Sequence, residues 1–236
     1  TAVTVNLGTG SASGGEAAGD VLSGIENLLG GNAADILTGD AGANRLSGAA
    51  GNDTLSGGAG DDILAGGAGS DRLTGGDGAD TADYSASAAA VNVDLTRATA
   101  QSGGDAAGDI LAGIENLTGG VGNDLLTGDG GANTLTGGGG SDTLNGGGGD
   151  DLLVFRASDF PAGSGGTLAD FVYGGGGADT LDISAVGQNF QLLINGVEQP
   201  LPAGSHEYVD TQGIQGDIRF GDNSVIHLDG VEKIIY

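Results

Sequence analysis

Aspartates recur every nine residues along much of this chain, each framed by glycines and followed two residues later by an aliphatic side chain. From Gly57 the sequence reads GGAGDDILA, and from Gly66 it reads GGAGSDRLT. Asp62 and Asp71 hold the same place in these two nonapeptides. Oxygen ligands repeated at a short fixed spacing suit a hard cation such as Ca²⁺, which takes roughly six to eight of them. A period this short also indicates a repeat architecture.

Each nonapeptide combines a turn with a very short strand. The glycine-rich GGxGxD part suits a tight turn with positive φ angles, and the last three residues form a strand with one aliphatic pointing inward. Two nonapeptides make one coil of a flattened solenoid, and coils stack at about 4.8 Å, the ordinary spacing of strands. Side chains two repeats apart therefore form columns. In the first array one edge carries Asp35, Asp53 and Asp71 and the other carries Asn44, Asp62 and Asp80. In the second array Asp124 and Asp142 share one edge, and Asn133 and Asp151 share the other.

Stacked carboxylates predict bound cations, because without a counterion they would repel one another. Carboxylates and backbone carbonyls in flexible turns favour several Ca²⁺ ions, whereas Mg²⁺ demands a tighter octahedron. Zn²⁺ is a poor candidate, since the chain has no Cys and no paired-His motif. A metal-free solenoid is the alternative, but one aliphatic per nonapeptide cannot outweigh the entropy of ordering nine residues. Metal binding must therefore supply folding free energy.

The nonapeptides match GGxGxDxUx, where U is a large aliphatic, and so resemble the RTX (repeats-in-toxin) family of secreted Gram-negative proteins. The match covers residues 30–83, 119–154 and 174–182. The resemblance implies an all-β fold, a right-handed parallel β-roll with Ca²⁺ between successive turns on both edges. It implies side-chain ligands at Asp35, Asn44, Asp53, Asp62, Asp71, Asp80, Asp124, Asn133, Asp142, Asp151 and Asp179.

The same resemblance implies that backbone carbonyls of the first four motif positions are ligands. Asn44 and Asn133 depart from the motif, and their neutral amides predict weaker sites. The implied carbonyl ligands belong to Gly48, Ala50, Gly51, Gly57, Gly58, Ala59, Gly60, Gly66, Gly67, Ala68, Gly69, Gly75, Asp77, Gly137, Gly139, Gly140, Gly146, Gly148, Gly174 and Gly176.

The chain divides into three parts. Residues 1–28 return, slightly altered, as residues 89–117, and each copy leads into nonapeptides. We therefore expect a spacer and first array at 1–88, a second spacer and array at 89–154, and a last RTX turn with an aromatic-containing, β-rich C-terminal cap at 155–236. The final DGVEKIIY echoes the GIENL of the spacers, with Glu232 in the place of Glu26. No stretch shows a helical period, so little helix is expected.

Composition restricts the partners. The 236 residues include 53 glycines, and 32 acidic against 6 basic residues give a net charge of -26. Such a charge repels nucleic acid and anionic membranes. No apolar run approaches the roughly 18 residues of a membrane span, so no membrane insertion is expected. No P-loop, GxSxG elbow or HExxH motif is present. These residues therefore predict no enzyme.

Two classes of function remain. In the first, favoured by the two spacer-plus-array copies, the chain is a calcium-binding structural module of an adhesin, surface layer or filament. In the second, it is the calcium-folding and secretion module of an exoenzyme such as a protease or lipase, with the catalytic domain before Thr1. The resemblance implies type I secretion from a Gram-negative bacterium and folding on Ca²⁺ outside or on the cell surface. The open first coil and the aromatic tail predict self-association.

Overall fold

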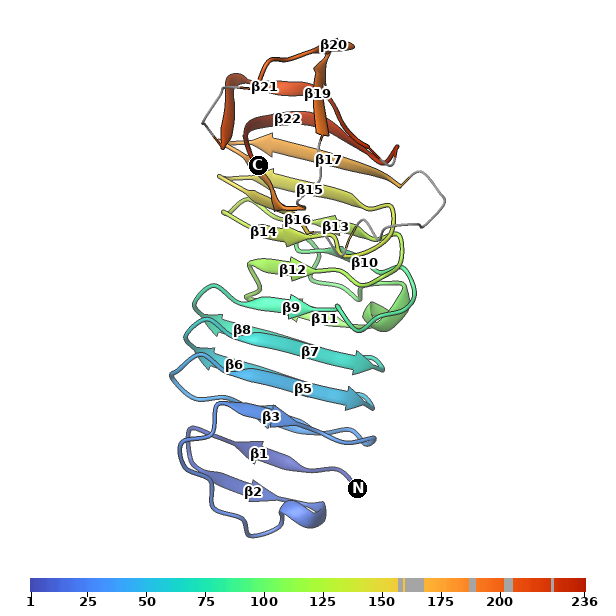
Figure 1. Ribbon diagram of the computed structural model, residues 1–236. Helices are drawn as coiled ribbons and strands as arrows, with labels where there is room; N and C mark the ends of the chain where they lie inside the picture. The colour runs from blue at the N-terminus through green and yellow to red at the C-terminus, as the bar shows by residue number, and fades with distance from the viewer. Residues whose placement is uncertain (157–158, 160–167, 187–189, 202–205, 222) are drawn as a thin grey trace. The chain divides into compact units, whose positions relative to one another are not determined.

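The computed structural model describes the chain except residues 157–158, 160–167, 187–189, 202–205 and 222. It separates into two compact units, Thr1–Thr118 and Gly119–Tyr236. Both are built of short strands, and the helical turns named in the described ranges are two short 3₁₀ turns, η1 (Gly15–Ala17) and η2 (Gly104–Ala106). The predicted all-β class with little helix is confirmed (Figure 1). The three-part division at residues 88 and 154 stays a prediction.

The first unit is a parallel β-roll in which successive strands alternate between two sheets (Figure 1). In-register pairs such as Leu46↔Leu64 and Leu55↔Leu73 show that one coil takes two nonapeptides. One sheet runs in the order β2 (Ser11–Ser13), β1 (Thr4–Asn6), β4 (Ile36–Thr38), β6 (Thr54–Ala59), β8 (Arg72–Asp77) and β11 (Ile110–Ala112). The other runs in the order β3 (Asn27–Leu29), β5 (Arg45–Ala50), β7 (Ile63–Ala68), β9 (Thr81–Asp83) and β12 (Asn116–Thr118).

The core of the roll is a single layer of aliphatic side chains. Leu46, Leu55, Leu64 and Leu73, one from each successive nonapeptide, are all 0% exposed. The residues before and after each leucine point outward, as the two-residue period of a strand requires. The apolar layer is therefore as thin as the sequence predicts, and it places each motif aspartate two residues from the core, at the edge of the sheet.

The second unit continues the same construction. Its parallel strands are β13 (Leu125–Thr127), β15 (Thr143–Gly148) and β17 (Ala169–Gly176) on one side, and β14 (Thr134–Thr136), β16 (Leu152–Arg156) and β18 (Thr180–Ala185) on the other. The long strand β22 (Val225–Ile235) closes both sides. Its first half pairs with β17 and its last residues pair with β18, both in parallel.

The end of the second unit is an antiparallel assembly, as expected for the β-rich C-terminal cap. Strand β21 (Glu207–Phe220) pairs with β22 and with β19 (Phe190–Ile194), which also pairs with β20 (Val197–Glu198). Its core contains Ile214, Ile218, Ile226 and Ile234, each 0% exposed. Several large apolar side chains therefore meet here, in contrast to the single leucine of a nonapeptide.

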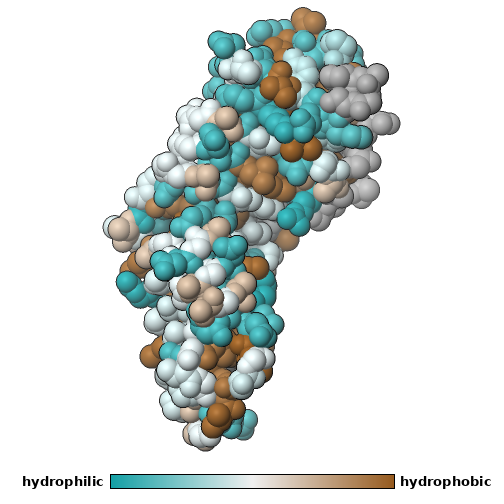
Figure 2. Space-filling view, turned by 90° about the vertical axis from the view of Figure 1, so that its left-hand side faces the viewer, coloured by the Kyte–Doolittle hydropathy of each residue, from teal (hydrophilic) through white to brown (hydrophobic). Residues whose placement is uncertain are grey.

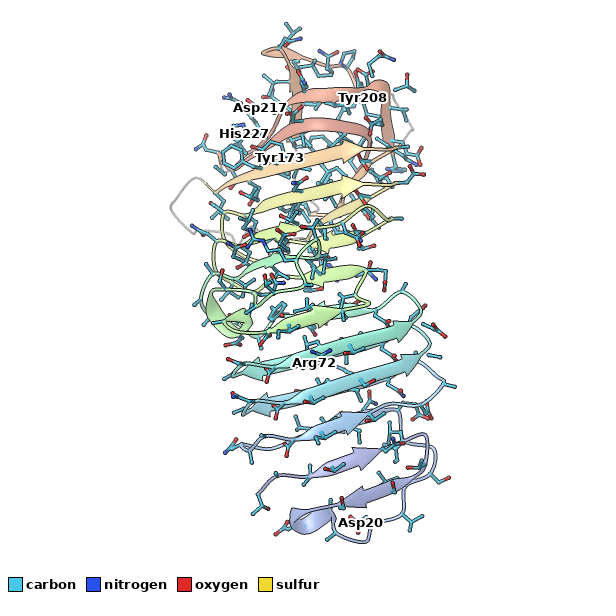
Figure 3. All side chains as sticks on the ribbon, turned by 180° about the vertical axis from the view of Figure 1, so that it is seen from behind. Asp20, Arg72, Tyr173, Tyr208, Asp217 and His227 are labelled. Carbon is cyan, nitrogen blue, oxygen red and sulfur yellow. The ribbon has the colours of Figure 1, made fainter. Side chains whose placement is uncertain are left out.

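The two spacers fold alike but differ in what they pack against. Each contains a 3₁₀ turn and antiparallel pairing, with Thr4↔Ser13 between β1 and β2 in the first and Asn92↔Ser102 in the second, where Asn92 begins strand β10 (Asn92–Asp94). In the second spacer, β11 lies beside β8 and buries Asp109 completely. The corresponding Asp20 is exposed, at the end of the first unit (Figure 3), and Val21 is 88% exposed. On the face drawn in Figure 2, hydrophobic residues lie near this end among hydrophilic ones.

Candidate calcium sites

Carboxylates form hydrogen-bonded columns along both edges of the first unit. On one edge, the backbone N–H of Asp35 donates to Oδ1 of Asp53 and that of Asp53 donates to Oδ1 of Asp71, both at 2.7 Å. On the other, Asn44 N–H donates to Oδ1 of Asp62 at 2.7 Å, and Asp62 N–H donates to Oδ1 of Asp80 at 2.8 Å. Each motif side chain therefore fixes the coil before its own, and the two predicted columns of this unit are present.

The second unit repeats the columns. Asp124 N–H donates to Oδ1 of Asp142 at 2.8 Å on one edge. On the other, Asn133 N–H donates to Oδ1 of Asp151 at 2.8 Å, and Asp151 N–H donates to Oδ1 of Asp179 at 2.9 Å. The 28 residues between Asp151 and Asp179 exceed the regular spacing of 18, yet the column is maintained.

The second oxygen of seven motif aspartates is buried and has no hydrogen-bond partner among the described residues. A buried carboxylate oxygen without a partner costs free energy, and a bound cation removes that cost. These atoms therefore fit a metal ion. They are the Oδ2 atoms of Asp53, Asp62, Asp71, Asp80, Asp142, Asp151 and Asp179.

The four remaining predicted side-chain ligands differ in their hydrogen bonds. Oδ2 of Asp35 accepts the N–H of Gly31, at 2.6 Å. Oδ1 of Asn44 accepts the N–H of Asp40, at 2.7 Å. In the second array Asp124 and Asn133 accept backbone N–H groups of the same turn in the same way. These positions belong to the first coil of each array, where the motif is least regular. Their metal ligation stays a prediction.

The first glycine of each motif leaves room for an ion beside the carboxylate. A Cβ added to Gly146 would collide with Oδ2 of Asp151 and with the carbonyl oxygen of Gly174, which belongs to the following coil. A Cβ added to Gly48 would meet Asp53 and the carbonyl of Gly66 in the same way. A carboxylate and a carbonyl of adjacent coils therefore face one small space, and these are ligands that Ca²⁺ prefers.

The family of the chain follows from its repeats. The family model of the RTX calcium-binding nonapeptide repeat matches in four copies, at residues 22–55, 47–82, 118–153 and 164–182. The chain belongs to the RTX calcium-binding repeat family. RTX repeats bind Ca²⁺, so the predicted cofactor is confirmed. The repeat is a structural calcium-binding element rather than a catalytic one, and it is typical of secreted Gram-negative proteins.

Other comparisons add little to this assignment. No curated protein gave a significant match. Among solved structures, the extracellular lipase LipA from Serratia marcescens matches with 19% identity and a TM-score of 0.29. The match covers 86% of this chain and 40% of the lipase chain, so the RTX chain spans less than half of that protein's length. No helix in the described ranges is long and apolar enough to cross a membrane.

The RTX sites depend on backbone oxygens. Nowhere in the described part of the chain do three or more Asp, Glu or His side chains gather as a metal-binding group. A column supplies its carboxylates one coil at a time, which fits the prediction that carbonyls of the glycine turns are further ligands. The twenty predicted carbonyl ligands are consistent with this need, and their individual assignments stay predictions.

Burial makes the RTX carboxyls hard to ionise without metal. It raises the pKa of Asp142 to about 8 and those of Asp71 and Asp151 to about 6. In each case backbone hydrogen bonds from the preceding coil lower the pKa, while neighbouring aspartates raise it further. In the calcium-free roll Asp142 therefore stays mostly protonated at neutral pH, whereas Asp71 and Asp151 become mostly protonated only below about pH 6. A cation must compete with protons for these oxygens.

Two members of the columns were missed by the sequence analysis. Oδ1 of Asp109 accepts the N–H of Asp71, and Oδ1 of Asp170 accepts the N–H of Asp142, both at 2.7 Å. Oδ2 of Asp109 also accepts the hydroxyl of Tyr84, at 3.0 Å. The available signals were local. Residues 109–112 read DILA, as do residues 62–65, and Asp170 precedes a GGGG turn by four residues, as Asp142 does.

Proposed function

We propose that the chain is a calcium-folded structural module of a secreted protein, without catalytic activity of its own. The observation that carries the proposal is the set of seven buried carboxylate oxygens without partners, in a roll whose core holds one leucine per nonapeptide. Ca²⁺ at the edges removes the repulsion between coils and supplies the missing folding free energy. Extracellular modules bind Ca²⁺ with dissociation constants of roughly 0.1–1 mM, so the roll folds after secretion.

Our ligand assignment ranks the sites by their hydrogen bonds. The seven aspartates with an unpartnered Oδ2 are assigned as the main side-chain ligands. Asp35, Asp124, Asn44 and Asn133 are assigned to weaker sites, because backbone N–H groups compete with the ion for their oxygens.

A matched pair of glycine substitutions tests the assignment. In Gly146→Ala the new methyl group occupies the space between Asp151 and the Gly174 carbonyl, whereas in Gly148→Ala it makes only ordinary contacts. Calorimetric titration with CaCl₂ should show that Gly146→Ala has lost one ion from the stoichiometry and that Gly148→Ala retains it. Equal stoichiometry in both variants would contradict the assignment.

The wider role that we favour is a surface component, an adhesin, surface layer or filament, on the outside of a Gram-negative cell. The exposed Val21 and Leu29 near the first coil, 88% and 76% exposed, support self-association. Light scattering with and without Ca²⁺ tests this, and a strict monomer in both conditions would contradict it. The alternative role is the calcium-folding module of an exoenzyme. A hydrolase domain in the same polypeptide would favour this second role.

A further inference from the structure

In each unit, one column of aspartates ends on a glutamate. The N–H of Asp80 donates to Oε2 of Glu115 at 2.9 Å, across 35 residues of sequence. The N–H of Asp179 donates to Oε2 of Glu232 at 2.8 Å, across 53 residues. The two glutamates belong to GIENL in the second spacer and to the related GVEKI near the C-terminus. Each therefore takes the hydrogen-bonding place that the next motif aspartate holds elsewhere.

The backbone around both glutamates lies where another nonapeptide would lie. The N–H groups of Glu115 and Asn116 both donate to the carbonyl of Asp80, at 3.1 and 2.8 Å. Those of Glu232 and Lys233 donate to the carbonyl of Asp179, at 3.1 and 3.0 Å. The following residues pair in register with β9 and β18, as the strand of a further coil would. Two unrelated connections thus reach the same arrangement.

The glycine two residues before each glutamate has its carbonyl oxygen where a regular site has the carbonyl oxygen of the following coil. A Cβ on Gly75 would collide with Oδ2 of Asp80 and the carbonyl oxygen of Gly113. A Cβ on Gly174 would collide with Oδ2 of Asp179 and the carbonyl oxygen of Gly230. Both spaces are bordered by an aspartate Oδ2 atom and a backbone carbonyl oxygen, like the space at Gly146, except that the carbonyl comes from outside the nonapeptides.

We propose that the Gly-x-Glu segments 113–115 and 230–232 each complete one further calcium site, at the end of an array. Gly113 and Gly230 supply a carbonyl oxygen, and Glu115 and Glu232 supply the negative charge that a motif aspartate supplies elsewhere. An independent observation also points to a ligand: the side chains of Asp80 and Asp179 are 0% exposed, and the Oδ2 atom of each has no hydrogen-bond partner within the described ranges. The inference rests on the proposed calcium-dependent folding and adds residues that the nonapeptide motif does not contain.

Glutamate-to-glutamine substitutions test the inference in the full chain. Glu115→Gln and Glu232→Gln remove the charge but keep a side-chain oxygen that can accept the N–H of Asp80 or Asp179. Glu26→Gln is the matched control, because Glu26 lies in the same GIENL sequence but is exposed. Calorimetric titration with CaCl₂ should show either one ion lost or one site weakened by roughly 10- to 100-fold in each of the first two variants. The control should match the unsubstituted chain.

The possible results distinguish a failure of this inference from a failure of the proposed calcium-dependent folding. If the unsubstituted chain binds calcium and both variants bind the same number of ions with the same affinity, the inference is overturned. A loss of thermal stability in saturating calcium with an unchanged ion count and unchanged affinities also overturns it, because the glutamates would then be structural only. If the unsubstituted chain binds no calcium, the proposed function itself fails. Should one variant not fold, the other, in the other unit, gives the same test.

Discussion

The nonapeptide coils and the C-terminal strands β19–β22 stabilise β structure by different means. A coil buries one leucine per nonapeptide, and seven motif aspartates keep a buried Oδ2 atom that has no hydrogen-bond partner among the described residues. The C-terminal strands bury many large side chains, and the rings of Phe190 and Tyr236 pack edge to face with centroids 5.4 Å apart. Their Asp217 accepts hydrogen bonds from His227 at 2.8 Å and Arg219 at 3.2 Å (Figure 3).

The difference shows where the charge of each region is neutralised. Burial alone would raise the pKa of Asp217, but its hydrogen bonds from His227 and Arg219 lower it overall. In the coils burial dominates, and the pKa of Asp142 rises to about 8. The C-terminal strands therefore supply the counter-charge of Asp217 themselves, whereas the motif aspartates with an unpartnered Oδ2 must obtain theirs from solution. Each of the following predictions tests this contrast.

The largest expected effect is the loss of a core leucine. Leu144→Ala should lower the free energy of unfolding in saturating calcium by about 2–5 kcal/mol, because Leu144 is fully buried and the layer has no neighbour to fill the cavity. Ile226→Ala in β22 should cost a similar amount, since apolar packing is common to both regions. Guanidinium denaturation measures both, and a cost under about 1 kcal/mol for Leu144→Ala would contradict a structural role for the thin layer.

Removing one carboxylate charge should have opposite effects with and without calcium. In chelator at neutral pH, Asp151→Asn should stabilise the roll by about 1–3 kcal/mol, because a buried, unpartnered oxygen becomes neutral. In calcium the same substitution should weaken binding. Asp217→Asn is the control in the C-terminal strands, where the carboxylate already has partners, and it should stabilise neither state. The β signal in circular dichroism in chelator and thermal melts in calcium, for the unsubstituted chain and both variants, provide the measurement.

Most of the regular roll could be predicted from the sequence because every nonapeptide has the same local chemistry. The period places Leu64 in the core and Asp62 on an edge without any knowledge of distant contacts. Asp109 and Asp170 could not be placed in this way, since their partners lie 38 and 28 residues away and the spacing depends on intervening loops. The pairing of β22 with β17 was unpredictable for the same reason, because it is a long-range contact without a repeated pattern. Its pairing with β18, in contrast, involves the GVEKI segment that echoes GIENL.

The pH dependence of the calcium-free chain should also distinguish the regions. The pKa values of Asp142, about 8, and Asp151, about 6, lie above that of an unfolded aspartate. Their folded state therefore holds protons more tightly, and stability falls as the pH rises from about 5 to 8, by up to about 1.4 kcal/mol per pH unit for each group until its folded pKa is passed. The lowered pKa of Asp217 acts in the opposite sense, and its contribution is lost only on acidification below its unfolded pKa.

Circular dichroism in chelator between pH 5 and 8 measures this dependence as the share of β signal that the calcium-free chain retains. Calcium should stabilise the chain more strongly as the pH rises over the same interval, because deprotonated carboxylates become available to the ion. A calcium-free β signal that rises with pH would contradict the raised pKa values of the coils.

The smallest effect is expected at an ion pair on the surface of the C-terminal strands. Lys233 Nζ lies 2.9 Å from Oε1 of Glu207, and both side chains are partly exposed. Lys233→Gln should cost roughly 0.2–1 kcal/mol and should leave the calcium stoichiometry unchanged. Denaturation combined with calorimetry tests both points. A change in ion count would show that calcium binding also involves the C-terminal strands, which contradicts the contrast between the two regions.

The most direct test of the calcium account is circular dichroism of chelator-treated protein during a titration with CaCl₂, followed by a parallel titration with MgCl₂. The account predicts a largely disordered spectrum that converts cooperatively to a β spectrum with Ca²⁺, and a weak response to Mg²⁺. It would be contradicted by a stripped chain that retains the complete β spectrum and melts at the same temperature as the calcium-loaded chain.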